Sequence, residues 1–183
     1  MLADWHEFYA LLGGAAAALL SLLFVVASIG ASAMTEETAG PTRTFMSPVA
    51  FHYANVVFLG LVALIPTQTW ESFGLTLGVA AVASLVYSIV ILVRVLRDSR
   101  ADMIDNVAYG AVPVVCYATG IVASVLILKE SAAGLNMLAG AALFLLIVNI
   151  RNAWDLMLSM ARRCAKRPSC KSDANVSRRP PSL

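Results

Sequence analysis

Five apolar runs, each close to the length that crosses a lipid bilayer, constrain this chain more than any other feature. They cover residues 8–33, 48–65, 75–95, 107–128 and 132–150. A helix needs roughly 20 apolar residues to cross ~30 Å of hydrocarbon. Because lipid offers no water to the backbone, a single spanning segment must satisfy its own hydrogen bonds as a helix. The sequence therefore predicts an all-α, polytopic membrane helical bundle with five transmembrane helices.

The composition agrees with lipid as the solvent of this chain. Hydrophobic residues make up 60% of the sequence and charged residues 13%, whereas a soluble domain carries about 25% charge. The charges that would cover a water-soluble domain are missing between the apolar runs. We therefore expect one transmembrane domain over residues 1–160, followed by a basic, disordered tail over 161–183, where prolines and charges disfavour packing.

The positive charges alternate between the loops and so predict an orientation. One side of a five-span arrangement holds Arg43, the cluster Arg94, Arg97 and Arg100, and every positive residue from Arg151 onward, which is 12 of the 13 Lys and Arg. Only Lys129 falls on the other side. Basic loops stay in the cytoplasm, so we expect the N-terminus outside and the C-terminus in the cytoplasm. The basic tail lacks interleaved aromatic residues, which argues against nucleic acid as a partner.

Two local signals concern helix ends. Ser47 followed by Pro48 is typical of an N-cap and a first helical residue, and so predicts where the second helix begins. Pro66 predicts its end. Pro113 lies inside the fourth apolar run, where a proline removes one backbone hydrogen bond and predicts a kink.

Small residues gather where helices are expected to approach closely. They are Gly13, Gly14, Ala17 and Ser21 in the first run, Gly74 and Gly78 in the third, and Gly120 and Ser124 in the fourth. Such surfaces serve packing inside one bundle or between copies of a chain. Because small residues are common in both kinds of contact, the sequence does not distinguish a homo-oligomer interface from packing inside one bundle.

Catalytic and metal-binding patterns are missing from the sequence. It contains no HExxH, GxSxG, GxGxxG or phosphate-binding glycine loop. Cys164 and Cys170 lack the spacing of a zinc site, and Cys116 lies in an apolar run. We therefore expect no enzyme, no metal site and no cofactor.

Polar residues near the predicted cytoplasmic ends of the spans form the candidate site for a ligand or a proton. They are His52 and Asn55 in the second span, Tyr109 in the fourth, and Asn149, Arg151, Asn152 and Asp155 at the end of the fifth. His52 is the one span residue whose charge can change near neutral pH. Asn55, Asn149 and Asn152 are the nearest candidates to hydrogen-bond it, and Arg151 can pair with Asp155. Ordinary helix–helix hydrogen bonds and snorkelling would also explain these residues.

The first two spans resemble a known family. The resemblance rests on three features: the segment from Trp5 to Tyr9 (WHEFY), the Gly13-Gly14 stretch running into LLFVVAS, and a second span ending in Leu64-Ile65-Pro66 with Gln68. They resemble small five-span bacterial proteins labelled modulators of the FtsH protease. The resemblance implies a bacterial inner-membrane location and supplies no catalytic residues.

Two functions follow as expectations. The first is a non-enzymatic membrane protein that regulates or scaffolds other membrane proteins. The second is a homo-oligomeric ion channel or small-solute transporter that uses the polar cluster at the cytoplasmic leaflet. In both, the lipid bilayer is a partner, and the chain binds other membrane proteins or copies of itself.

Overall fold

The computed structural model describes residues 3–31, 36–97 and 110–165, with side chains for 4–28, 48–94, 96–97 and 110–158. A short 3₁₀ turn η1 (Ala3–Trp5) leads into five helices: α1 (His6–Ala31), α2 (Glu36–Ala63), α3 (Trp70–Arg97), α5 (Val112–Leu128) and α6 (Ala132–Ala165). None of these residues forms a strand. The expected all-α bundle is confirmed for this part of the chain.

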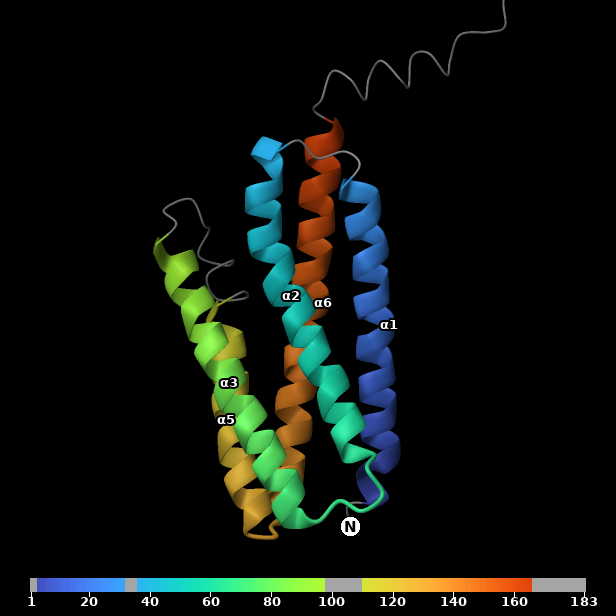
Figure 1. The fold of residues 1–183 in the computed structure, drawn as a ribbon, viewed down its shortest axis with the longest axis vertical. Helices are drawn as coiled ribbons and strands as arrows, with labels where there is room; N and C mark the ends of the chain where they lie inside the picture. Colours follow the sequence, from blue (N-terminus) through green and yellow to red (C-terminus); the bar gives the residue numbers. More distant parts are fainter. Residues whose placement is uncertain (1–2, 32–35, 98–109, 166–183) are drawn as a thin grey trace, which may run out of the picture.

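The helices run side by side and alternate in direction (Figure 1). The N-terminus, the α2–α3 connection and the α5–α6 turn lie at one end of the bundle, and the last turns of α1, α3 and α6 lie at the other. α6 packs against α5, α2 and α1, whereas α3 packs mainly on α5 and α2 mainly on α1. α2 and α3 touch only slightly. The bundle is therefore two helix pairs joined through α6.

Three of the described helices are long and apolar enough to cross a membrane, over His6–Ser28, Trp70–Arg94 and Ala132–Leu158. Two shorter apolar helical stretches, Pro48–Ala63 and Val112–Leu128, lie antiparallel to them. Large apolar side chains such as Leu11, Val79 and Ile147 are exposed on the outer faces. Membrane association follows from these faces, because such apolar surface is stable against lipid and not against water.

The expected start of the second helix is wrong. α2 begins at Glu36, so Ser47 and Pro48 lie inside a helix of 28 residues. A proline costs a helix one backbone hydrogen bond, which membrane helices tolerate through adjacent groups. The local capping signal is therefore overridden by the longer helix. At the other end α2 stops at Ala63, before Pro66 as expected.

Pro113 does not lie in the middle of a described helix. It is the second residue of α5, directly after a wide, π-type turn at Gly110 and Ala111. A proline is tolerated in a first turn, because an N–H group at that position has no helical partner. Residues 98–109 lie outside the described part, so the kink expected in the fourth run stays a prediction.

Two helices are longer than the spans expected for them: α3 begins earlier and α6 ends later. α3 begins at Trp70, where the Thr69 hydroxyl oxygen accepts a hydrogen bond from the Ser72 backbone N–H at 3.1 Å. This is a side-chain N-cap, since it satisfies one of the free N–H groups of the first turn. α6 continues to Ala165, past both the expected span end at 150 and the domain boundary at 160. The tail from 166 lies outside the described residues.

Glycines bring the helices close together at the end of the bundle that holds the N-terminus. A Cβ placed on Gly60 of α2 would lie 2.9 Å from the Cα of Gly13 and 2.9 Å from the Tyr9 carbonyl oxygen of α1. Real Cβ atoms do not approach so closely, so the α1–α2 crossing requires glycine on the α2 side. Gly14 has open space around its Cα, and Ala17 and Ser21 are half-buried and exposed, respectively.

Glycines also allow close approach between α3 and α5 and between α5 and α6. A Cβ on Gly74 would lie 3.2 Å from the Ser124 carbonyl oxygen, and one on Gly78 would lie 3.1 Å from the Ser124 hydroxyl oxygen. A Cβ on Gly134 would lie 2.8 Å from the Ala123 carbonyl oxygen. A Cβ on Gly120 would make only an ordinary van der Waals contact with Ala81. We call Gly13, Gly60, Gly74, Gly78 and Gly134 the glycine-packed end.

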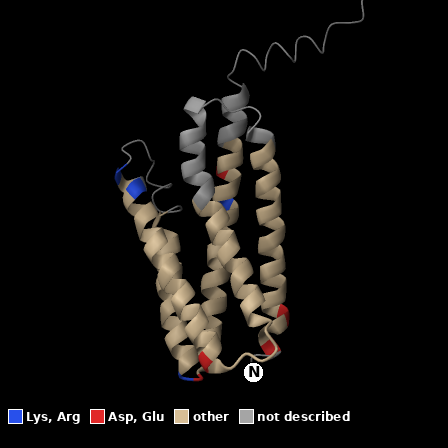
Figure 2. Cartoon of the chain, viewed as in Figure 1, with Lys and Arg blue, Asp and Glu red and all other residues tan. Residues whose placement is uncertain are grey.

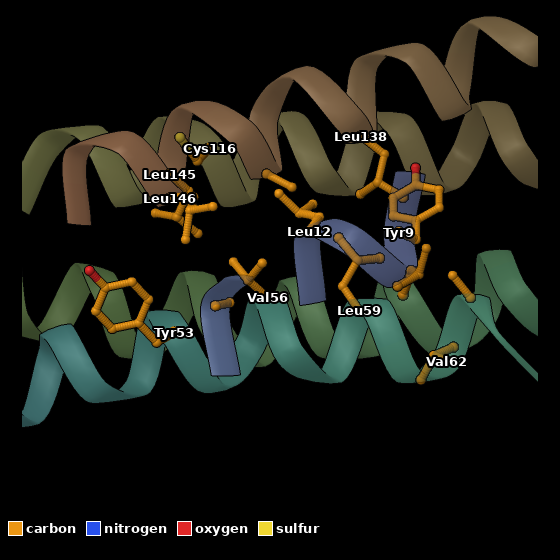
Figure 3. Close-up of a cluster of buried hydrophobic side chains, with 14 of the residues drawn as sticks. Tyr9, Leu12, Tyr53, Val56, Leu59, Val62, Cys116, Leu138, Leu145 and Leu146 are labelled. Carbon is orange, nitrogen blue, oxygen red and sulfur yellow. The ribbon is translucent and has the colours of Figure 1, made fainter. Parts of the chain in front are cut away.

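Apolar side chains fill the space between the helices (Figure 3). Val56 and Leu59 of α2 lie between the ribbons of α2 and α6, in one cluster with Leu145 of α6 and Leu12 of α1. Tyr9 is 1% exposed, stacks edge-on with Phe73 at 6.5 Å between ring centroids, and donates a 3.4 Å hydrogen bond to the Leu135 carbonyl. This tyrosine ties α1 to α3 and α6.

Candidate functional site

The buried histidine of the second span has a specific partner. His52 of α2 is 3% exposed, and its Nδ1 lies 2.9 Å from the hydroxyl oxygen of Tyr117 on α5. The two rings are tilted by 38° with centroids 5.6 Å apart. The ring therefore faces the interior of the bundle and not the lipid.

A second polar pair links α2 to α3. Ser84 donates a hydrogen bond of 2.8 Å to Oδ1 of Asn55, and Nδ2 of Asn55 donates one of 2.9 Å to the Phe51 carbonyl in its own helix. Ser84 is 2% exposed. Because α2 and α3 otherwise touch little, this hydrogen bond is a main direct connection between them.

The two asparagines of the last helix are also buried. Asn149 of α6 donates from Nδ2 to the Val49 carbonyl of α2 at 2.9 Å, while its Oδ1 has no hydrogen-bond partner among the described residues. Asn152 is buried one turn further along α6. Of the three expected candidates, Asn55 and Asn149 bond other groups, and a residue outside that set, Tyr117, places its hydroxyl group at hydrogen-bond distance from the His52 ring.

These contacts share one slice of the bundle. Val49, His52 and Asn55 span two turns of α2, about 9 Å at the helical rise, and each connects to a different neighbouring helix. We call His52, Asn55, Ser84, Tyr117 and Asn149 the polar level. Inside apolar surroundings such groups are stable only when they are hydrogen-bonded, so this slice fixes how four helices sit around one another.

The charged pair of the candidate site lies elsewhere. Arg151 and Asp155 form the expected (i, i+4) ion pair at 3.3 Å, with side chains 47% and 40% exposed. Because both side chains are this exposed, the pair lies on the surface of α6 and does not join the buried polar groups. Tyr109 lies outside the described residues, so its place relative to them is not described.

A cavity of about 70 Å³ lies beside the polar level, between α2, α3, α5 and α6. Its polar lining comes from Asn55, Ser84 and Tyr117. The rest of its wall is apolar and includes Phe58, Leu59, Leu77, Ala80, Ala81, Cys116, Gly120, Leu138, Ala141, Ala142 and Leu145. The polar level therefore borders a largely apolar cavity that is partly open at the surface of the bundle.

Sequence reasoning missed Tyr117 and Ser84. Both lie near the middle of apolar runs, whereas the search concentrated on span ends. A signal was present for Ser84, because Ser84, Tyr87 and Ser88 are spaced i, i+3 and i+4 and so lie on one side of an otherwise apolar helix. Tyr117 offered no such pattern. Its role depends on the Tyr117 side chain reaching His52 from α5, a helix that packs mainly on α3 and α6, and the sequence does not specify this arrangement.

No protein-family model, curated protein or solved structure matches this chain.

Proposed function

We propose that this chain is a five-span protein of the bacterial inner membrane, with its N-terminus outside and its C-terminus in the cytoplasm. The shorter apolar stretches Pro48–Ala63 and Val112–Leu128 would cover about 24–26 Å at the helical rise, close to a thin bilayer core of ~27 Å. Both run antiparallel to the three longer helices, which supports five crossings over three.

The charges of the described residues support the orientation. Acidic residues gather at the end that holds the N-terminus (Figure 2), where Asp4 and Glu7 open the chain, Glu71 lies in the first turn of α3, and Glu130 follows Lys129 in the α5–α6 turn. Arg94 and Arg97 lie in the last turn of α3 at the other end, and Arg151 lies in the second half of α6, paired with Asp155. Basic residues remain on the cytoplasmic side of a membrane protein. The arginine-bearing end is therefore the proposed cytoplasmic end.

Single cysteines test this topology. In a variant whose three native cysteines are serine, Lys129→Cys should react with a membrane-impermeant thiol reagent in intact cells. Arg97→Cys should react only after permeabilisation. Reaction of Arg97→Cys in intact cells would overturn the orientation, and equal behaviour of both positions would overturn the crossing count.

We further propose that the protein is not an enzyme and acts as a regulatory or scaffolding partner of other membrane proteins. The observation that carries this role is that the buried polar side chains are engaged within one bundle, as His52 with Tyr117 and Asn55 with Ser84. The outward faces are apolar and large. Contacts with other proteins inside the membrane would then use these apolar faces, by close packing against partner helices.

Purification in a mild detergent tests this role. A single copy that copurifies with a larger membrane protein supports it, and the resemblance in the first two spans makes a membrane protease of the FtsH class the first partner to probe. A symmetric oligomer with an ion-conducting axis would instead establish the alternative, a homo-oligomeric channel or small-solute transporter.

A further inference from the structure

The cavity beside the polar level reaches the outer surface of the bundle. Phe58 lines it and is 41% exposed, and Ala80 on α3 is half-buried. Both residues lie at the seam where α2 and α3 touch little. In a bilayer this seam faces hydrocarbon, so a molecule dissolved in the membrane can enter sideways between the two helices.

The size and wall of the cavity restrict what fits. Its volume of about 70 Å³ is roughly half that of an engineered ~150 Å³ cavity that accepts benzene, which favours a narrow chain over a ring. A water needs ~10–15 Å³ of such volume and two to four polar partners. Polar atoms come from Asn55, Ser84 and Tyr117, so partners for a hydroxyl group or a water exist at one end of the cavity, and the remainder suits hydrocarbon.

The polar end of the cavity offers both a hydrogen-bond donor and a hydrogen-bond acceptor. Asn55 uses one of its two amide N–H groups on the Phe51 carbonyl, and the other can donate. The Ser84 hydroxyl donates to Asn55 and keeps lone pairs that can accept. A single hydroxyl group placed between them can therefore donate and accept at once.

From this arrangement we propose that the cavity is a binding site for a membrane-dissolved aliphatic alcohol. Its hydroxyl group bonds Ser84 and Asn55, and its alkyl chain lies along Leu59, Leu77 and Leu138 toward the seam. The site goes beyond the regulatory role, because it does not depend on which protein the bundle contacts.

Photolabelling tests the site with the full chain in phosphatidylcholine nanodiscs. The probe is octanol carrying a diazirine on its chain, and the matched control is the same diazirine on octane. Labelling of Phe58, Ala80 and Ala141, read by mass spectrometry, should saturate with the alcohol and fall when unlabelled octanol is added. The octane probe should label these residues no more than the lipid-facing Leu61.

Two substitutions sharpen the result. Ala80→Leu fills the mouth of the cavity and should reduce saturable labelling at least fivefold, whereas Ala83→Leu, on an exposed face of the same helix, should not. Ser84→Ala should raise the half-saturating concentration about fivefold, as expected for one lost hydrogen bond. Should Ala80→Leu fail to fold, Ala141→Leu fills the cavity from α6 with the same expected loss.

The proposal is overturned by labelling that rises linearly with the alcohol and resists competition. It is equally overturned if Ala80→Leu and Ala141→Leu label like the parent. Saturable labelling by octane and octanol alike would identify a plain hydrocarbon site and refute the hydroxyl contacts.

Discussion

The glycine-packed end and the polar level of this bundle join their helices by different kinds of contact. At the glycine-packed end, Gly13 and Gly60 bring two backbones into direct contact, and Gly134 does the same for α5 and α6. At the polar level, nearer the middle of the helices, single hydrogen bonds join them, such as the one between His52 and Tyr117. Backbone contact leaves no room for change, while a hydrogen-bonded pair can be exchanged for an apolar pair of similar shape. The difference indicates that the glycine-packed end stabilises the fold and that the polar level specifies a site.

The largest expected effect comes from the α1–α2 crossing. Gly60→Ala would place a methyl group 2.9 Å from both the Gly13 Cα and the Tyr9 carbonyl oxygen, so the helices must separate. We expect a loss of about 2 kcal/mol in the free energy of unfolding, as for other overpacked sites, measured by denaturant titration in detergent micelles.

Gly14→Ala is the matched control, because a Cβ there meets nothing within 4 Å. Its unfolding free energy should stay within about 0.5 kcal/mol of the parent. Because alanine favours a helix more than glycine does, helix propensity cannot cause a loss, and equal losses in Gly60→Ala and Gly14→Ala would show that the close backbone contact at Gly60 does not govern this end.

A smaller effect is expected from the His52–Tyr117 pair. Tyr117→Phe leaves His52 without the hydroxyl group at 2.9 Å and should cost about 1 kcal/mol, within the range for hydrogen bonds between membrane helices. His52→Leu should cost a similar amount. The double variant should cost less than the sum, because no buried group is then left unpaired. Additive losses in this cycle would mean that the two side chains do not interact.

The smallest effect concerns the α5–α6 turn. Glu130 has a positive φ of 56°, and its N–H bonds the Ile127 carbonyl while the Ser131 N–H bonds the Leu126 carbonyl. This is a Schellman motif, whose left-handed position favours glycine. Glu130→Gly should therefore raise the free energy of unfolding by about 0.5 kcal/mol. Glu71→Gly, in the first turn of α3, is the control and should lower it.

The sequence was informative where the physics is local to one helix. Apolar length predicted all five described helices, and the spacing of Arg151 and Asp155 predicted their ion pair. The sequence did not predict features that depend on which helices contact one another. Gly60 stands alone in its run, and Tyr117 becomes a partner of His52 only because the packing of α5 on α3 and α6 turns its side chain toward α2. Neighbour relations between helices of similar apolar character leave little trace in a single sequence.

The predicted start of α2 was wrong for a related reason. Ser47 and Pro48 form a good local cap, yet the helix continues through them from Glu36. A cap contributes about 1 kcal/mol, which is small beside the contacts that a long helix makes along its neighbours.

One measurement compares the glycine-packed end with the polar level directly. The triple variant His52→Leu, Tyr117→Phe, Asn149→Leu makes three of the five side chains of the polar level apolar and removes the unpaired Oδ1 of Asn149, and it is unfolded beside Gly60→Ala in the same detergent. The account predicts that the triple variant folds and loses less than about 1 kcal/mol, whereas Gly60→Ala loses about 2 kcal/mol. A triple variant that is less stable than Gly60→Ala would contradict the account, because the polar level would then hold the bundle together.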